Sequence, residues 1–226
     1  MRQGMARCVA AGVAAMSVAA LAGCESAGVQ RNFDRGSLQT DIRSEANLFE
    51  TAVVSDLSGT ASYAGVAAAE FSTQQGSFAA TADMRMTADF SNSTLNGVMT
   101  GWTHEDPLNY DMRGRVRISN GVINPQRLAA LPEFAEYAGF PEGSFVAQTA
   151  GNVEAVPTAR NLTANRAEDA EPVRQEWAWF GGTATGSFHD TAGTGQRATH
   201  VVGEFATGGD EASPVRAGGF FALRRD

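Results

Sequence analysis

The sequence predicts an all-β protein: a single antiparallel β-barrel of about eight strands with one short helix, preceded by a signal peptide and an N-terminal tether. Three observations indicate this class. Short segments alternate apolar and polar residues, connections rich in Gly, Asn and Asp separate them, and glycines recur inside the segments. A β-sandwich fits the first two observations as well, whereas a solenoid is disfavoured because the segments have no fixed repeat length.

Residues 1–23 have the order of an export signal. Arg2 and Arg7 form a basic start, and residues 8–20 hold no charge. This apolar run is shorter than the roughly 20 residues that a membrane-spanning helix needs. Residues 21–24, Leu-Ala-Gly-Cys, then resemble the bacterial lipobox, whose cysteine is acylated after cleavage in front of it.

Cys24 is therefore the predicted lipidation site. Acyl chains such as palmitate would anchor the mature chain to the bacterial outer membrane, on its surface or its periplasmic face, because two or more chains hold a protein firmly. A plain secretory signal followed by a chance cysteine is the alternative. Cys8 and Cys24 are the only cysteines, so the mature domain is predicted to have neither a disulfide nor a cysteine-built metal site.

The charge of the chain limits its partners. All 17 basic residues are arginines, and without Arg2 and Arg7 the remaining 15 face 25 acidic residues, a formal charge of −10. Such a balance repels nucleic acid, so no nucleic-acid partner is expected.

Residues 24–54 are predicted to form the tether and residues 55–226 the barrel domain. Leu38 and Ile42 give the tether a weak helical pattern, with Asp34 or Ser37 as a cap, which predicts a short helix. A disordered tether fits its polar composition equally well.

Period-two alternation is clearest in residues 78–90. Met84 and Met86 share one face there, and Asp83 and Arg85 share the other, which is typical of a half-buried strand. The other strand patterns cover residues 63–71, 95–102, 112–118, 145–153, 176–188, 198–206 and 215–224.

The middle of the chain contains turn and helix signals. The pair Asn120-Gly121 predicts a hairpin turn at the end of a strand. Asn124 followed by Pro125 predicts a short helix over residues 124–131, and the polar residues 159–175 predict a loop.

Seven glycines lie inside strand patterns, where glycine normally lowers stability. Barrels place glycine where a strand bends or where an aromatic ring lies over the backbone, so these positions favour a tightly curved barrel over a sandwich. Its interior would be filled by side chains or hold one small ligand. The glycines are Gly97, Gly101, Gly114, Gly186, Gly203, Gly218 and Gly219, and the aromatic residues expected inside are Phe78, Phe90, Trp102, Phe188, Phe205 and Phe220.

Four segments, in order, resemble the barrel domain of transferrin-binding-protein-B-like lipoproteins. They are residues 88–97 (ADFSNSTLNG), 181–189 (GGTATGSFH), 200–205 (HVVGEF) and 217–224 (AGGFFALR). The resemblance covers about residues 55–226 and implies a lipid-anchored barrel of the outer membrane. Relatives of that family capture iron carriers, haem or immune regulators of a host. The chain shows one barrel and no second lobe, so transferrin binding itself is not expected.

Three histidines are candidate ligand-binding residues. His189 and His200 flank a connection between two strand patterns, and with Asp190 they could meet and bind a metal or the iron of haem. His104 could form a polar site at a barrel mouth. Hydrogen-bonded histidines near strand ends are the alternative, and nothing else in the sequence predicts a cofactor.

Trp177 and Trp179 are further candidates, since period two places both on one face. They could form an exposed recognition ridge beside the loop at residues 159–175, or pack in the core.

These features together predict a monomeric lipoprotein that binds a small ligand in the barrel mouth or a protein partner on its loops. The resemblance adds iron or haem acquisition as a use, and a structural or envelope-interaction lipoprotein without a small ligand is the alternative. No catalysis is predicted, because Ser187 and His189 are alternate strand residues rather than parts of a triad and no Gly-x-Ser-x-Gly elbow occurs.

Overall fold

The computed structural model describes residues 34–46, 52, 57–73, 76–130, 132–158, 176–190, 197–207 and 216–226, without the side chains at 73, 76, 129–130, 132–134 and 176–180. The predicted signal peptide, Cys24 and the predicted loop at residues 159–175 lie outside these ranges. Within them, no helix has the length and apolar character needed to cross a membrane.

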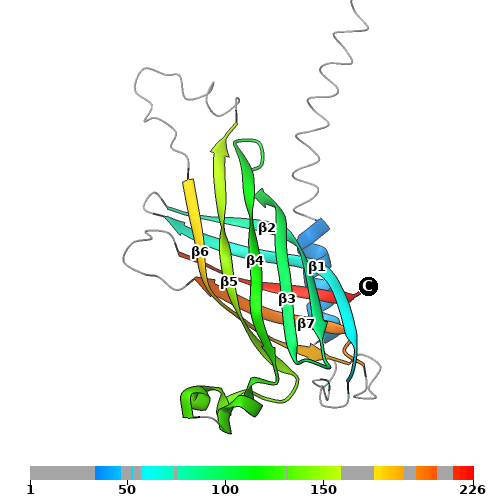
Figure 1. The fold of residues 1–226 in the computed structure, drawn as a ribbon. Helices are drawn as coiled ribbons and strands as arrows, with labels where there is room; N and C mark the ends of the chain where they lie inside the picture. Colours follow the sequence, from blue (N-terminus) through cyan, green and yellow to red (C-terminus); the bar gives the residue numbers. More distant parts are fainter. Residues whose placement is uncertain are drawn as a thin grey trace, which may run out of the picture.

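Eight antiparallel strands follow one another around a closed barrel (Figure 1). The predicted fold class is confirmed, and the sandwich is excluded, because β1 pairs with both β2 and β8 and leaves no open edge. The strands are β1 (Thr60–Thr73), β2 (Gly76–Asp89), β3 (Thr94–His104), β4 (Tyr110–Ile123), β5 (Ser144–Pro157), β6 (Glu176–His189), β7 (His200–Thr207) and β8 (Arg216–Arg225).

Side chains fill the barrel interior, with an aromatic cluster towards each end and methionines between them. Phe188 contacts Tyr63, Phe90 and Phe145 at the end where β1 begins. Towards the other end, Phe71 stacks on Phe78 and meets Trp102 edge to face. Met84, Met86 and Met99 are fully buried between these clusters. The inward faces predicted by alternation are therefore packed core.

One predicted core residue faces outwards. Phe220 is 49% exposed, whereas Phe221 is fully buried. A shift of one residue moves a strand side chain to the opposite face, and Gly-Gly-Phe-Phe contains no alternation that fixes which phenylalanine points inwards. A Cβ added at Gly203 would collide with the ring of Phe221, and one at Gly186 would lie 2.8 Å from the ring of Phe145. These two rings thus confirm the expectation of aromatic residues over strand glycines.

The predicted hairpin turn at Asn120-Gly121 is wrong. Both residues lie inside β4, where the pairing with β5 shifts between Ser119 and Val122. Asn120 has a φ of 52°, which Asn tolerates, and its side-chain amide donates to Gln148 Oε1 at 2.8 Å. The same preference for positive φ that builds Asn-Gly turns here builds a β-bulge.

The segment between β4 and β5 is 3₁₀ rather than α-helical, with η2 spanning Pro125–Ala130 and η3 spanning Pro132–Gly139. Asn124 does not cap a helix, because its Oδ1 accepts a hydrogen bond from the Gly143 amide at 2.7 Å. The asparagine instead ties together the two ends of this excursion.

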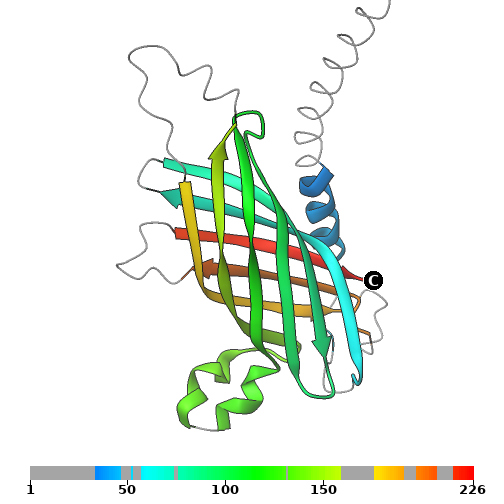
Figure 2. The ribbon, with the colours of Figure 1, turned by 45° about the horizontal axis from the view of Figure 1, so that its top comes forward.

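Residues 34–46 form the helix that the tether pattern predicted, and it lies on the outside of the barrel. Figure 2 shows it in blue beside the cyan β1 and the red β8. Ile42 and Ala46 are buried on its inner side, as are Val66 of β1 and Ala222 of β8 on the outer face of the barrel. None of the four belongs to the interior cluster, so they form a second, external apolar contact.

Candidate binding surface

The outer face of five adjacent strands, β2, β1, β8, β7 and β6, is divided into two halves. Strand registers arrange its outward side chains in rows. We call the two rows on the side of the helix the covered half, and the next two rows the open half. The rows of the covered half are Asp83, Val66, Ala222, Val202, Ser187 and Arg85, Ala64, Arg224, His200, His189; those of the open half are Ala79, Glu70, Gly218, Ala206, Thr183 and Thr81, Ala68, Phe220, Glu204, Thr185.

A buried arginine attaches the start of the helix to the covered half. Arg35 Nε donates to Asp83 Oδ1 at 2.9 Å, and its Nη2 lies 2.7 Å from Asp83 Oδ2. Its Nη1 donates to Thr103 Oγ1 of β3 at 3.0 Å. Planar guanidinium geometry suits this two-point contact with a carboxylate, so the helix start is fixed over β2 and β3.

An ion-pair cluster attaches the other end of the helix. Glu45 Oε2 lies 2.7 Å from Arg224 Nη2 and 3.0 Å from His200 Nε2. The hydrogen bond from Arg224, followed by that of His200, holds the pKa of Glu45 below its ordinary value. Burial lowers the pKa of His200, which favours its neutral form even beside a carboxylate.

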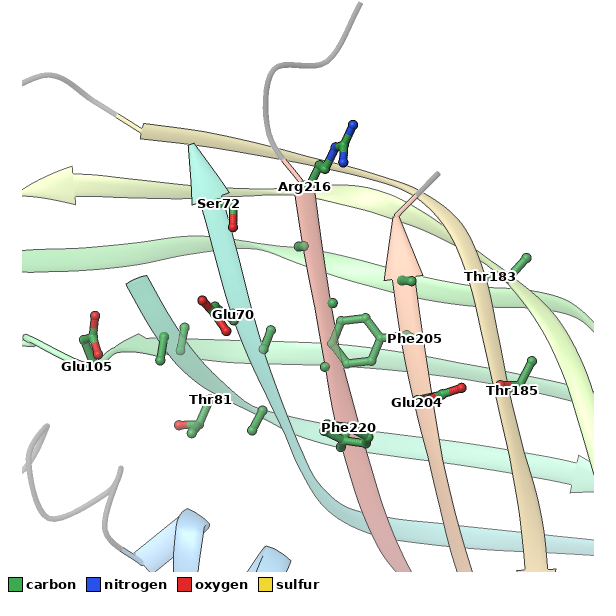
Figure 3. Close-up of a pocket in the computed structure, with 18 residues that line it drawn as sticks. Glu70, Ser72, Thr81, Glu105, Thr183, Thr185, Glu204, Phe205, Arg216 and Phe220 are labelled. Atoms are coloured by element: carbon green, nitrogen blue, oxygen red, sulfur yellow. The ribbon is translucent and has the colours of Figure 1, made fainter. Parts of the chain in front are cut away.

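The open half forms a cavity of about 1270 Å³ (Figure 3). All ten of its residues line this cavity, and apart from Glu70, Phe220 and Glu204 they are Ala, Gly or Thr. Small side chains leave the sheet surface hollow here, beyond the reach of the described helix. Phe220 therefore stands in this surface with half of its side chain exposed.

Phe220 also marks the border between the halves. The Arg43 guanidinium of the helix lies 4.9 Å from its ring centroid, and the Gln39 side chain donates to its carbonyl at 3.0 Å. A cation over an aromatic face is a favourable contact. The helix thus holds the border of the cavity but leaves the rest open.

The cavity has a negative balance of charge. Among the described residues that line it, Glu70, Glu204 and Glu105 face a single cation, Arg216. Glu204 lies directly across the β7–β8 ladder from Phe220. None of these four charged side chains forms an ion pair with another residue that the structure describes. The surface therefore favours a partner that combines apolar and cationic groups.

Two of the predicted site residues come together in the covered half. His189 and His200 are directly paired between β6 and β7, and both face outwards. Ser187 Oγ lies 2.8 Å from His189 Nε2, while His200 Nε2 faces Glu45. In the described ranges, no three His, Cys, Asp or Glu side chains are arranged to hold a metal ion.

His104 lies at the opposite end of the barrel. It is 5% exposed and stacks between Phe78 and Tyr110, with ring centroids 4.7 and 4.6 Å away. The amide of Asp106 donates to its Nδ1 at 2.8 Å, which places the proton of the neutral ring on Nε2. Burial lowers the pKa of His104, so this ring is a neutral member of the aromatic packing.

Trp177 and Trp179 lie in β6, opposite Glu154 and Asn152 of β5. Their side chains are outside the described part, so both stay predictions. The sequence interpretation missed the open half altogether. A sequence signal for it did exist. Arg216 and Arg224 are an even number of residues from Phe220, so all three lie on the same face of β8, and two arginines mark that face as the outer one.

Comparisons with known proteins add a distant likeness. Neither a family model nor a curated protein matches the sequence. Among solved structures, the chain is similar to a double mutant of the vaccine antigen Transferrin Binding Protein B from Haemophilus parasuis Hp5, with 14% identity and a TM-score of 0.43. The match covers 78% of this chain and 27% of that one. At this distance the likeness carries no argument about function, and the barrel is established by its own strand order.

Proposed function

We propose that the chain is a lipid-anchored binding protein of the bacterial outer membrane, and that the open half is its binding surface. The observation that carries this proposal is the cavity of about 1270 Å³ around a half-exposed phenylalanine. Aromatic residues are enriched among the side chains that dominate binding energy, and a hollow, apolar floor gives a partner area to bury.

The sequence also allowed a small ligand in the mouth of the barrel. The interior is filled by side chains, which argues against that alternative. Phe71, Phe78, Trp102 and His104 pack together towards one end, and Phe188 with its neighbours towards the other. A partner therefore meets the barrel from outside. A protein segment that places an apolar group on Phe220 fits this surface, and a positive charge near Glu70 or Glu204 would complement it.

Lipid anchoring is the part of the proposal that depends on sequence alone. Cells grown with labelled palmitate should label the native chain and not the variant Cys24→Ser. The variant should also leave the membrane fraction. Equal labelling of both chains would refute the anchor and leave the binding surface to be judged separately.

Gly218 provides a direct test of the binding surface. A Cβ added there would meet only the carbonyl oxygen of Phe205, at 3.6 Å, so a larger side chain can enter the cavity without disturbing the sheet. Gly218→Trp should abolish capture of the partner from envelope or host extracts, whereas Gly218→Ala should retain it. A partner captured equally by both variants would refute the open half as the surface. Absence of any partner would favour a structural envelope lipoprotein.

A further inference from the structure

A second charged surface is centred on β4, which lies across the barrel from β8, and it extends over β3 to the edge of the covered half. Its outward residues Arg113, Arg115 and Arg117 are all exposed. Arg85 of β2 joins them across β3, because Val98 is paired with Arg85 on one side and with Arg117 on the other. We call these four side chains the arginine wall.

The arginine wall is largely uncompensated. Val98, Asn152 and Ala150, which lie next to Arg117 and Arg115 on the neighbouring strands, are uncharged. The carboxylates beside it are few: Glu154 lies across from Arg113, and Asp111 lies further along β4. Asp83 lies next to Arg85 on the outer face of β2, but it is already paired with Arg35. In the part of the chain that the structure describes, none of the four arginines forms an ion pair.

An independent observation concerns the place where the anchored end of the chain meets the barrel. The described part of the helix starts with Asp34, and Arg35 next to it is bound to Asp83 of β2 and Thr103 of β3. Residues 25–33 join this point to Cys24, and a chain of that length reaches at most about 35 Å. The chain thus approaches the barrel beside β3, the strand that separates Arg85 from the rest of the wall.

From these two observations we infer that the arginine wall lies on an anionic membrane surface when the chain is anchored through Cys24. The inference rests on the proposed lipid anchor. Guanidinium groups bind phosphates in two-point contacts, and basic residues next to an anchor are attracted to anionic headgroups within a Debye length. Beyond a Debye length, the net negative charge of the chain repels an anionic membrane. The arginine wall therefore binds the headgroups only after the lipid anchor has brought it close to the membrane.

This orientation also places the proposed binding surface. In a closed ring of eight strands, β8 lies opposite β4. With the arginine wall on the membrane, Phe220 and its cavity face away from it. The orientation thus leaves the open half accessible to a partner that arrives from solution.

The single thiol of the mature chain allows a direct test. Cys24 of the purified mature chain can be coupled to a maleimide lipid in nanodiscs of phosphatidylcholine, with or without phosphatidylglycerol, which are small enough for amide NMR signals to be resolved. A gadolinium-chelating lipid then broadens the amide NMR signals nearest the bilayer. We expect the β3 and β4 signals to broaden at least about twofold more than those of β7 and β8, and only when phosphatidylglycerol is present.

Two matched variants complete the test. The triple variant Arg113→Gln, Arg115→Gln, Arg117→Gln should lose this bias. The control variant Arg127→Gln, Arg197→Gln, Arg225→Gln removes the same charge from other exposed positions and should keep it. Equal broadening of the β3–β4 and β7–β8 signals in the native sequence, or stronger broadening of β7 and β8, would overturn the inference. Because the anchor is attached chemically, such a failure is distinct from a failure of lipidation at Cys24 in cells.

Discussion

The covered and open halves belong to one sheet face, yet they meet the surroundings differently. In the covered half, Val66 and Ala222 are buried, as is Ile42 of the helix, and charged groups towards both ends of the helix hold it in place. In the open half, mostly Ala, Gly and Thr surround Phe220, and no described element lies on them. One half is thus occupied by a segment of the chain itself, whereas the other leaves an aromatic side chain half exposed on a hollow surface.

Docking of the helix on the covered half uses both shape and charge. Ile42 is buried on the inner side of the helix, while Arg35 and Glu45 supply polar contacts at the two ends. In the open half Phe220 offers an apolar surface and Glu204 a negative charge, so the partner must bring the complementary cation.

The largest effect is expected from Ile42→Ala. Deleting a fully buried branched side chain should lower the free energy of unfolding of the docked helix by about 2–4 kcal/mol. Trypsin cleavage after Arg43 should then become much faster, which gel electrophoresis can follow. Leu38→Ala, at a position that is 41% exposed, is the control and should cleave at the native rate. Equal rates in all three chains would mean that the helix does not depend on its apolar contact.

The two adjacent glycines of β8 should differ clearly. A Cβ at Gly219 would collide with the backbone of Ala68, whereas one at Gly218 meets only an ordinary contact. Gly219→Ala should therefore lower the free energy of unfolding by about 1–3 kcal/mol, and Gly218→Ala should leave it nearly unchanged. Urea unfolding followed by circular dichroism measures both. Equal destabilisation would place Gly218 against the barrel rather than in an open cavity.

Acid should weaken the covered half first. The folded-state pKa of His200 lies below its ordinary value of 6.5, so the unfolded chain binds more protons as the pH falls through that value, and stability is lost. The pKa of Glu45 is also lowered, so its contribution is lost only as the pH falls below about 4.5. Protection of Arg43 from cleavage by trypsin should therefore decrease as the pH is lowered from 7 to 5.5. Besides Glu45, the titratable or charged groups next to His200 are Arg224 and His189 on the neighbouring strands.

His200→Gln is the matched variant for this pH dependence. In this variant, protection from trypsin should stay constant between pH 7 and 5.5. Protection should still decrease at lower pH, because that decrease depends on Glu45. An unchanged profile in the variant would show that His200 does not report on helix docking.

The smallest effect on stability is expected from Phe220→Ala. The side chain is half exposed, so its removal should cost about 1 kcal/mol or less in a thermal melt. Binding of the partner should nevertheless weaken by about tenfold or more, because a central aromatic contact is lost. A large loss of stability with unchanged binding would assign Phe220 to the helix contact alone.

The sequence predicted the barrel well because most strands alternate. Met84 and Met86 point inwards and Arg85 outwards, as period two requires. The prediction from sequence failed at Phe220, where the alternation of apolar and polar residues stops. It also failed at Asn120-Gly121, because the tolerance of Asn for positive φ is used both in hairpin turns and in β-bulges. Both failures are local, since strand pairing decides them rather than the residues themselves.

The surface could be predicted only in part. Leu38 and Ile42 allowed a short helix in the tether as one of two alternatives, and residues 34–46 are helical, but only Ile42 of the two is buried. The attachment of the helix depends on Arg35, which an apolar pattern does not reveal. The open half depends on residues from five strands that are brought together by register. His189 and His200 were expected to meet because they flank one connection, and they do.

The open half should contact a partner in the cell. A photo-crosslinking residue, p-benzoylphenylalanine, can replace Phe220 in the open half, where it keeps an aromatic ring in place, and as a control Arg127, which is exposed and lies outside the cavity. Illumination of living cells should give a defined crosslinked product from position 220 and none from position 127. No product from position 220, or the same products from both positions, would contradict the open half as the binding surface.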